Sequence, residues 1–361
     1  MHCRFRQDGD HALAWFLLIY YQPNEMKRQR QMNENSAPKQ IKDNIYVFPI
    51  VLPDNPLKWL NCYAIKGRAG ERSLLIDSGF NRPECLEALC CGMASLGLEP
   101  ENTDVFFTHL HADHTGNAHA LEELGCRLIM GRKEYGFMRA QQELNWGGDI
   151  DRAMREGADA ACLENARDNK QSFLFESEPF SADCVDDGDE LCCGGHRLRC
   201  ILTPGHTPGH MCLYSAQDRL VFLGDHVLFD ISPNITDWNG VDDSLGDYLA
   251  SLEKMRGLRA EICLPGHRTA FGKSLDGRID ELIEHHGHRL AELEDIIGQN
   301  SGINAGEIAK SLSWHMRGKT WEEYSLSSRW FAFKETLAHL DHLAALGRIE
   351  YTADTGGYIK R

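Results

Sequence analysis

Hydrophobic residues gather in short segments along most of the chain from Asn44 onward. Segments rich in β-branched and aromatic side chains predict strands. The predicted strands are Ile45–Pro53, Cys62–Lys66, Ser73–Asp77, Val105–Thr108, Arg127–Met130, Leu198–Leu202, Met211–Tyr214, Leu220–Leu223 and Glu261–Leu264. Apolar residues at helical spacing predict helices at Pro83–Leu96 and Asn117–Leu124. Alternating strands and helices predict a layered α/β fold.

The first 43 residues differ from the rest. Residues 24–43 are polar and without apolar period, which predicts a flexible leader. The apolar run Ala12–Tyr21 is too short to cross a bilayer, and no small-residue cleavage site follows it. We therefore expect translation to start at Met26 or Met32, and regular structure to begin at Asn44.

Two further segments stand out from the predicted main domain, residues 44–275. Residues 138–170 are charged and helical in pattern, and are predicted to be an insertion rather than core. The amphipathic segment Arg278–Ile297 predicts a linker helix that opens a C-terminal module, residues 276–361. This module resembles a small winged helix, because its predicted elements are helices Ile303–Leu312 and Trp330–Leu346 and a hairpin of Arg348–Tyr351 and Gly357–Lys360.

Composition narrows the class of protein. The 361 residues carry a formal net charge of −16, which disfavours nucleic acid as a partner. The 13 cysteines are odd in number and form no C-x-x-C pair, which indicates free thiols in a reducing cytosol. We expect a cytoplasmic protein with no membrane partner.

The densest group of reactive side chains is THLHADHTGN, residues 108–117. His109 and His111 alternate, and Asp113 and His114 follow directly. Side chains one and two residues apart diverge on a helix, so this segment is predicted to be a loop that ends a strand. Four metal-competent side chains on a tight loop can converge on one point.

Three more candidate ligands occur in the same context. His206, Asp225 and His267 each follow a predicted strand and lie beside a glycine that permits a sharp turn. If these strands are neighbours, their loops meet at one edge of the sheets. Imidazole and carboxylate ligands suit zinc, and the same ligands accept iron or manganese.

The motif HLHADH resembles the metallo-β-lactamase superfamily, together with LLIDSG upstream and TPGHTPGH, FLGD and LPGH downstream. Within that superfamily the chain looks most like glyoxalase II and related hydrolases. The resemblance covers about residues 44–275 and implies an αβ/βα sandwich with two metal ions at one edge. The implied ligands are His109, His111 and His206 for one ion, Asp113, His114 and His267 for the other, and Asp225 as a bridge.

The resemblance also implies a reaction. Two divalent ions lower the pKa of a bridging water toward about 7, and the resulting hydroxide would attack a small carboxylic ester, thioester or lactone. Asp113 is the candidate that accepts or relays a proton. The carboxylate at Asp225 disfavours antibiotic hydrolysis, because the β-lactamases of this superfamily typically carry a cysteine there.

Two other activities of this superfamily are alternatives. One is RNA cleavage with the same metal set, and the other is persulfide oxidation at a single iron. The C-terminal segment from residue 301 has eight Lys and Arg against seven Asp and Glu, so it lacks the basic track that RNA needs. The complete ligand set disfavours the iron oxygenase.

Other residues have weaker claims. Asp77 is expected to hydrogen-bond beneath the site, and Ser78 to have a structural role in a turn. His210 is expected to be a packed histidine, although it could orient its loop, and His226 is expected to be a core or surface histidine rather than a ligand. The candidates for binding substrate are Arg317, Lys319 and Trp238.

Overall fold

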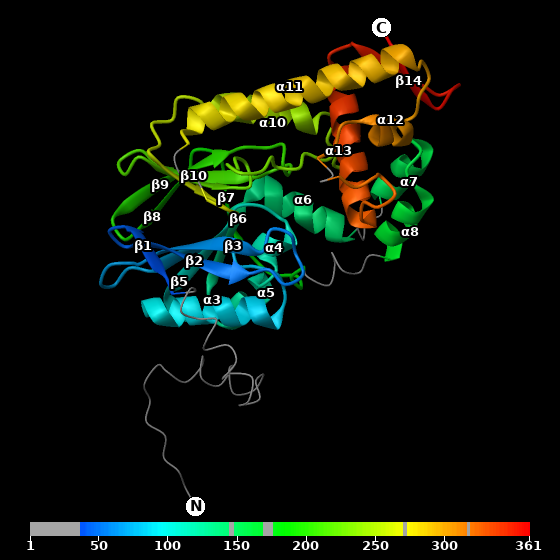
Figure 1. The fold of residues 1–361 in the computed structure, drawn as a ribbon. Coiled ribbons are helices and arrows are strands. Elements are labelled where there is room, and N and C mark those ends of the chain that lie inside the picture. The colour runs from blue at the N-terminus through cyan, green and yellow to red at the C-terminus, as the bar shows by residue number, and fades with distance from the viewer. Residues whose placement is uncertain (1–36, 144–147, 169–175, 270–272, 316–317) are drawn as a thin grey trace, which may run out of the picture.

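Two β-sheets form the centre of the protein (Figure 1). The computed structural model describes residues 37–143, 148–168, 176–269, 273–315 and 318–361. The seven-stranded sheet has the order β1 Lys39–Lys42, β2 Ile45–Val51, β3 Trp59–Ile65, β4 Ser73–Ile76, β5 Thr103–Phe107, β6 Arg127–Gly131 and β7 Asp183–Val185. The five-stranded sheet has the order β12 Ile262–Pro265, β11 Leu220–Gly224, β10 Met211–Ser215, β9 His196–Leu202 and β8 Glu190–Cys193.

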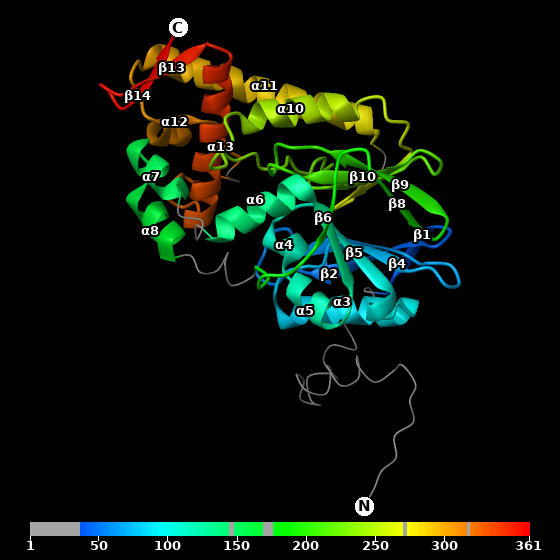
Figure 2. The same cartoon turned by 180° about the vertical axis from the view of Figure 1, so that it is seen from behind.

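Helices cover the outer face of each sheet (Figures 1 and 2). On the seven-stranded sheet lie α3 Pro83–Leu96 and α5 Ala118–Glu123, and on the five-stranded sheet lie α10 Ser244–Met255 and α11 Leu275–Gln299. Between the sheets, Phe106 and Phe222 belong to one fully buried apolar cluster. The predicted αβ/βα sandwich is therefore confirmed.

The strand directions decide where functional loops can meet. β4 and β5 run parallel in one sheet, and β11 and β12 run parallel in the other. Their carboxyl ends therefore lie at the same edge of each sheet. A hydrogen bond of 2.9 Å from Met211 N–H to the carbonyl of Thr108 joins the two sheets at that edge. The predicted meeting place of the loops follows from this arrangement.

Helices from two distant parts of the sequence form a unit at one end of the sandwich. The unit consists of α7 Gly148–Arg155, α8 Ala160–Asp168, α12 Ala305–Ser311, α13 Leu326–Ala345, β13 Ile349–Thr352 and β14 Gly357–Lys360. Three other elements, η2 Pro100–Asn102, α4 Ala112–Thr115 and α6 Arg132–Glu143, belong to the sandwich. α8 packs on α13, and Ala153 and Leu163 are buried in the same cluster as Leu337. Ala153 and Leu163 are therefore buried within a segment that we expected to lie outside the core, and the interpretation of residues 138–170 as an insertion stays a prediction.

Several elements differ from the sequence prediction. β1 lies inside the predicted leader and pairs with β2, so regular structure begins before Asn44. β7, β8 and α10 were not predicted, and β7 and β8 are only three and four residues long. In the described part of the chain, no helix is long and apolar enough to cross a membrane.

Candidate metal centre

The HLHADH segment forms a short turn and a one-turn helix at the end of β5. His109 is fully buried directly after the strand, and His111 occupies the N-cap of α4. The N–H of His114 donates to the carbonyl of His111 at 2.9 Å, which closes the turn. The segment is thus not entirely the irregular loop that we expected, because Asp113 and His114 belong to this helical turn.

The other three predicted ligands reach the same place from the five-stranded sheet. His206 follows β9, Asp225 follows β11 and His267 follows β12. Close packing there requires two glycines. A Cβ on Gly224, whose φ is 49°, would lie 2.6 Å from His210 Nε2, and a Cβ on Gly266 would lie 2.6 Å from Asp225 Oδ1. Only glycine allows these turns to approach the centre so closely.

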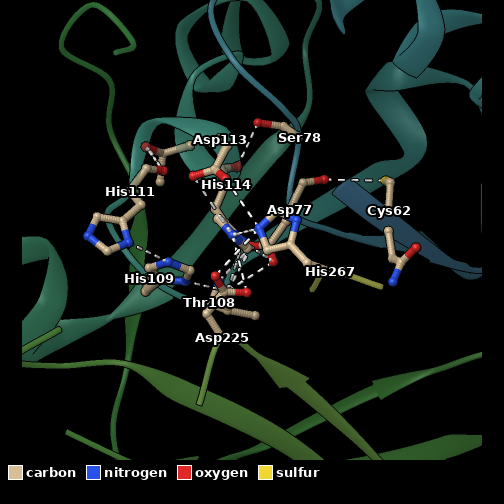
Figure 3. Close-up of polar contacts among 12 residues, drawn as sticks. Cys62, Asp77, Ser78, Thr108, His109, His111, Asp113, His114, Asp225 and His267 are labelled. Atoms are coloured by element: carbon tan, nitrogen blue, oxygen red, sulfur yellow. Dashed lines mark hydrogen bonds and ion pairs between the residues drawn. The ribbon is translucent and has the colours of Figure 1, made fainter. Parts of the chain in front are cut away.

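The structure brings all seven predicted ligands together. Three groups have candidate ligand atoms within 4.8 Å of one another: His109, His111 and His206; His109, His114 and Asp225; and Asp113, His114 and His267. We call the first group the first ligand set and the last group the second ligand set. Figure 3 shows that most of these side chains point toward a common centre.

Asp225 lies between the two sets. Its Oδ2 atom is 3.9 Å from His206 Nε2 and 3.4 Å from His267 Nε2. Its Oδ1 atom is 3.7 Å from His114 Nε2. One carboxylate therefore faces a histidine of the first set and two histidines of the second.

The donor atoms fit divalent ions. The Nε2 atom of His206 and the Oδ1 atom of Asp225 are buried and have no hydrogen-bond partner among the described residues. Buried polar atoms are almost always paired, so atoms left unpaired at such a convergence indicate room for an ion. The set of imidazole nitrogens and carboxylate oxygens is one that zinc accepts.

The opposite ring nitrogen is fixed in three of the histidines. His206 Nδ1 lies 2.8 Å from the carbonyl of Asn234, and His267 Nδ1 lies 3.0 Å from the carbonyl of Trp59. A carbonyl only accepts, so each Nδ1 carries the proton. His114 Nδ1 lies 2.8 Å from Asp77 Oδ2. Each Nε2 is thereby directed to the centre.

The electrostatics follow from burial and from mutual proximity. Burial and the neighbouring His206 lower the pKa of His111 to about 3, so its imidazole is neutral. Burial by itself raises the pKa of Asp113, but His114 and His267 outweigh it and lower that pKa to about 2. Neutral imidazole and ionised carboxylate are the forms that bind metal.

Asp77 lies where second-layer support was expected. Its carboxylate accepts from the N–H of Thr108 at 2.8 Å and from the hydroxyl of Thr108 at 2.9 Å, in addition to its contact with His114. Ser78 is fully buried and its hydroxyl donates to the carbonyl of His114 at 2.8 Å. Both residues hold the HLHADH turn from beneath.

His210 is fully buried and hydrogen-bonds to two neighbouring segments. Its Nδ1 atom lies 2.8 Å from the hydroxyl of Thr203, and its Nε2 accepts from the N–H of Asp225 at 3.2 Å. His210 is thus buried, as expected, and it is hydrogen-bonded to neighbouring loops without belonging to either ligand set. His226 is fully buried, and its ring meets that of Tyr248 edge-on at 5.4 Å between centroids.

Sequence reasoning missed Glu134, in the first turn of α6. This carboxylate is fully buried and accepts from the N–H of Leu110 at 2.8 Å and from the N–H of Gly209 at 2.6 Å. It therefore joins the turn of His109 and His111 to the loop of His206. Burial raises its pKa to about 7 despite these bonds. No pattern around GRKEY marks it, because its partners are backbone atoms of distant segments.

The candidates for binding substrate differ in position. Trp238 lies by the first ligand set, with its ring centroid 5.8 Å from that of His111 and its Nε1–H donating to the carbonyl of His206 at 3.1 Å. Lys319 is exposed, and none of its described contacts reaches the ligands. Arg317 lies outside the described residues.

Comparison with known proteins gives relatives named as beta-lactamase-like proteins or as thioesterases. The chain is 26% identical over 267 residues to the beta-lactamase-like protein 2 homolog of Caenorhabditis elegans, across 73% of this chain and 75% of the relative. It is 31% identical over 245 residues to the atrochrysone carboxyl ACP thioesterase of Aspergillus fumigatus, across 66% of this chain and 61% of the relative. It is 27% identical over 219 residues to the acyl-coenzyme A thioesterase MBLAC2 of Gallus gallus, across 57% and 72%.

A solved structure extends the similarity to most of the fold. A metallo-beta-lactamase family protein from Thermus thermophilus matches with a TM-score of 0.75 and 27% identity, across 89% of this chain and all of that one. The family model of the metallo-beta-lactamase superfamily matches residues 60–267, which contain all seven ligand residues. The chain therefore belongs to the metallo-beta-lactamase superfamily, a superfamily of hydrolases whose members bind metal ions.

Proposed function

We propose that this protein is a dinuclear metallohydrolase that cleaves acyl thioesters. The observation that carries the proposal is the pair of ligand sets with the Asp225 carboxylate between them. His109, His111 and His206 would hold one ion, and Asp113, His114 and His267 the other. Zinc is the ion that we expect, although iron and manganese accept the same ligands.

The ions, when bound, would supply Lewis acidity and a water of lowered pKa. The residues of the chain set the geometry for this chemistry. His114 Nδ1 is bonded to Asp77, and the backbone N–H of Asp225 donates to His210 Nε2. We assign Asp113 as the group that accepts and relays a proton, because one of its oxygens faces His267 at 3.2 Å and the side chain remains partly exposed.

The thioester class is supported by two relatives, which are an acyl carrier protein thioesterase and an acyl-coenzyme A thioesterase by their names. Their substrates share the thioester bond and differ in the carrier. The resemblance to glyoxalase II, the ester and lactone alternatives and the winged-helix comparison of the C-terminal module stay predictions. Trp238 is proposed to form a wall of the substrate site beside His111.

The test is a substrate panel on one batch of metal-analysed protein. Acyl-coenzyme A thioesters, carboxylic esters, lactones, phosphodiesters and single-stranded RNA are compared at equal concentration. We expect thiol release from the thioesters to be fastest, to disappear when a chelator removes the metal, and to return with added zinc. Preferential RNA cleavage, or thiol release that survives complete metal removal, would refute the proposal.

A matched pair of variants isolates the proposed proton acceptor. Asp113→Asn removes an ionised ligand of the second set, and we expect kcat to fall at least about 100-fold. Asp280→Asn is the control, because Asp280 is an exposed carboxylate paired with Arg256 on the surface. Equal activity of the two variants would remove Asp113 from the mechanism.

A further inference from the structure

The segment that follows Asp225 lies between the metal centre and the C-terminal helix α13. It leads from β11 to α10 and contains Val227, Phe229 and Ile235, which are buried in one cluster with Leu337 and Ala338 of α13. Figures 1 and 2 both show α13 standing at the end of the sandwich, beside α7 and α8. A helix about 100 residues away in sequence is thus packed on the loop that carries the bridging carboxylate.

A chain of hydrogen bonds runs from this helix to a metal ligand. Asn234 Nδ2 donates to Glu335 Oε2 at 2.8 Å, and the carbonyl of Asn234 faces His206 Nδ1 at 2.8 Å. Since a carbonyl only accepts, this contact keeps the proton of His206 on Nδ1. The lone pair of Nε2, which is buried and has no hydrogen-bond partner among the described residues, is then available to an ion.

The preceding residue of α13 holds the same loop at a second point. Lys334 Nζ lies 2.8 Å from Asp237 Oδ1, and the N–H of Asp237 donates to the carbonyl of Lys334 at 3.3 Å. Both side chains are buried. Arg152 of α7 lies 3.4 Å from the other carboxylate oxygen of Asp237. Two consecutive residues of α13 therefore fix positions 234 and 237.

We infer that Glu335 is a positioning residue for the first ligand set, acting on His206 through Asn234. Its carboxylate fixes the side chain of Asn234, and the residue then presents its backbone carbonyl to His206. The buried pair of Lys334 and Asp237 restricts the same loop, so Asn234 has few other orientations. The C-terminal helix is by this account part of the metal centre. The inference rests on the proposed dinuclear centre, and it needs no particular substrate.

The test measures metal affinity rather than turnover. Holoprotein is equilibrated with chelators of graded strength, and bound zinc is determined by elemental analysis. In Glu335→Ala, we expect the first ligand set to lose about 10- to 100-fold in affinity, the usual cost of removing an outer hydrogen-bond partner. Glu335→Gln retains an oxygen that accepts from Asn234 and should stay within about threefold of the wild type. Glu322→Ala, a change at an exposed carboxylate of the same module, is the matched control.

A spectroscopic readout separates positioning from general destabilisation. When cobalt replaces zinc, the visible absorption of the ion in the first ligand set should differ between Glu335→Ala and the wild type. The spectrum of Glu335→Gln should match that of the wild type. Native affinity and an unchanged spectrum in Glu335→Ala, or an equal loss in Glu335→Gln, would overturn the inference. If Glu335→Ala does not fold, Asn234→Ala provides the same test, and native zinc affinity there would also overturn it.

These results are independent of the proposed activity. Loss of affinity in Glu335→Ala with no thioester cleavage by the wild type would retain the positioning role and refute the substrate class. Thioester cleavage with unaltered affinity in Glu335→Ala would do the reverse.

Discussion

The two ligand sets differ in how the protein supports them. The first consists of three histidines, and its supporting contacts are neutral: the hydroxyl of Thr108 lies 3.0 Å from His109 Nδ1, and a carbonyl faces His206. The second set contains the carboxylate of Asp113, and a second carboxylate, Asp77, lies directly behind His114. Carboxylates also support the first set, but the buried Glu134 and the partly buried Glu335 act through backbone and amide groups.

This difference predicts unequal binding. Charges interact more strongly in a buried site than in water, so the Asp113 carboxylate in the second set and the Asp77 carboxylate behind His114 both favour a divalent ion there. The first set is all neutral except for the shared Asp225. We therefore expect the second set to fill first and to release its ion last. The identity of the ligands alone therefore does not rank the metal affinities of two adjacent sites, because the residues behind the ligands carry much of the charge.

The largest effect is expected from removing Asp225, the carboxylate that the two ligand sets share. Asp225→Ala deletes the carboxylate that faces His206 and His267, so zinc occupancy should fall at both sets and kcat by at least about 1,000-fold. His210→Ala keeps all seven ligands and should retain two ions by elemental analysis. An Asp225→Ala protein that still holds two ions, beside a His210→Ala protein that has lost them, would contradict the assignment.

A smaller change should affect one set only. Asp77→Asn removes the charge behind His114, and we expect the second set to lose about 10- to 100-fold in zinc affinity while the first set is unchanged. Competition with a chelator, followed by cobalt spectroscopy of each site, measures this. Equal loss at both sets would show that the two sites bind as one unit.

Glu134, which supports the first ligand set, should make the stability of the protein depend on pH. Burial raises its pKa from 4.5 to about 7, so between these values the folded protein keeps a proton that the unfolded chain has lost. Stability should therefore fall as pH rises from about 4.5 to about 7, by roughly 3 kcal/mol at most. Glu134→Gln cannot titrate, and the difference between wild type and variant in denaturant unfolding should follow this slope. A difference that is constant across the range would show that Glu134 is ionised throughout.

The smallest expected effect concerns the two cationic residues that the sequence predicts to bind substrate. If Arg317 and Lys319 bind an anionic part of the substrate, their joint change to alanine should raise KM roughly threefold to tenfold and leave metal content and Tm nearly unchanged. Trp238→Ala, beside His111, serves as the comparison and should raise KM as well. An unaltered KM in the double variant would limit substrate contacts to groups such as Trp238.

The ligand residues could be predicted because each carries its own signal. A histidine or aspartate beside glycine after an apolar strand is visible locally, and the parallel strand pairs bring these positions together. α10 also carried a signal, since Leu245, Tyr248 and Leu252 have helical spacing. The partners of Glu134 and Glu335 carried none. Both sets of contacts join segments far apart in sequence, and those of Glu134 depend on backbone atoms, which every residue has.

Each ligand set draws side chains from both sheets. His109 and His111 follow β5 of one sheet while His206 follows β9 of the other, and the second set is divided in the same way. An ion at either position would tie the two halves of the sandwich, and binding to the folded state alone adds to its stability. The supply of zinc would then affect how long the polypeptide survives proteolysis. A shortage of zinc would shorten the lifetime of the protein as well as lower its activity.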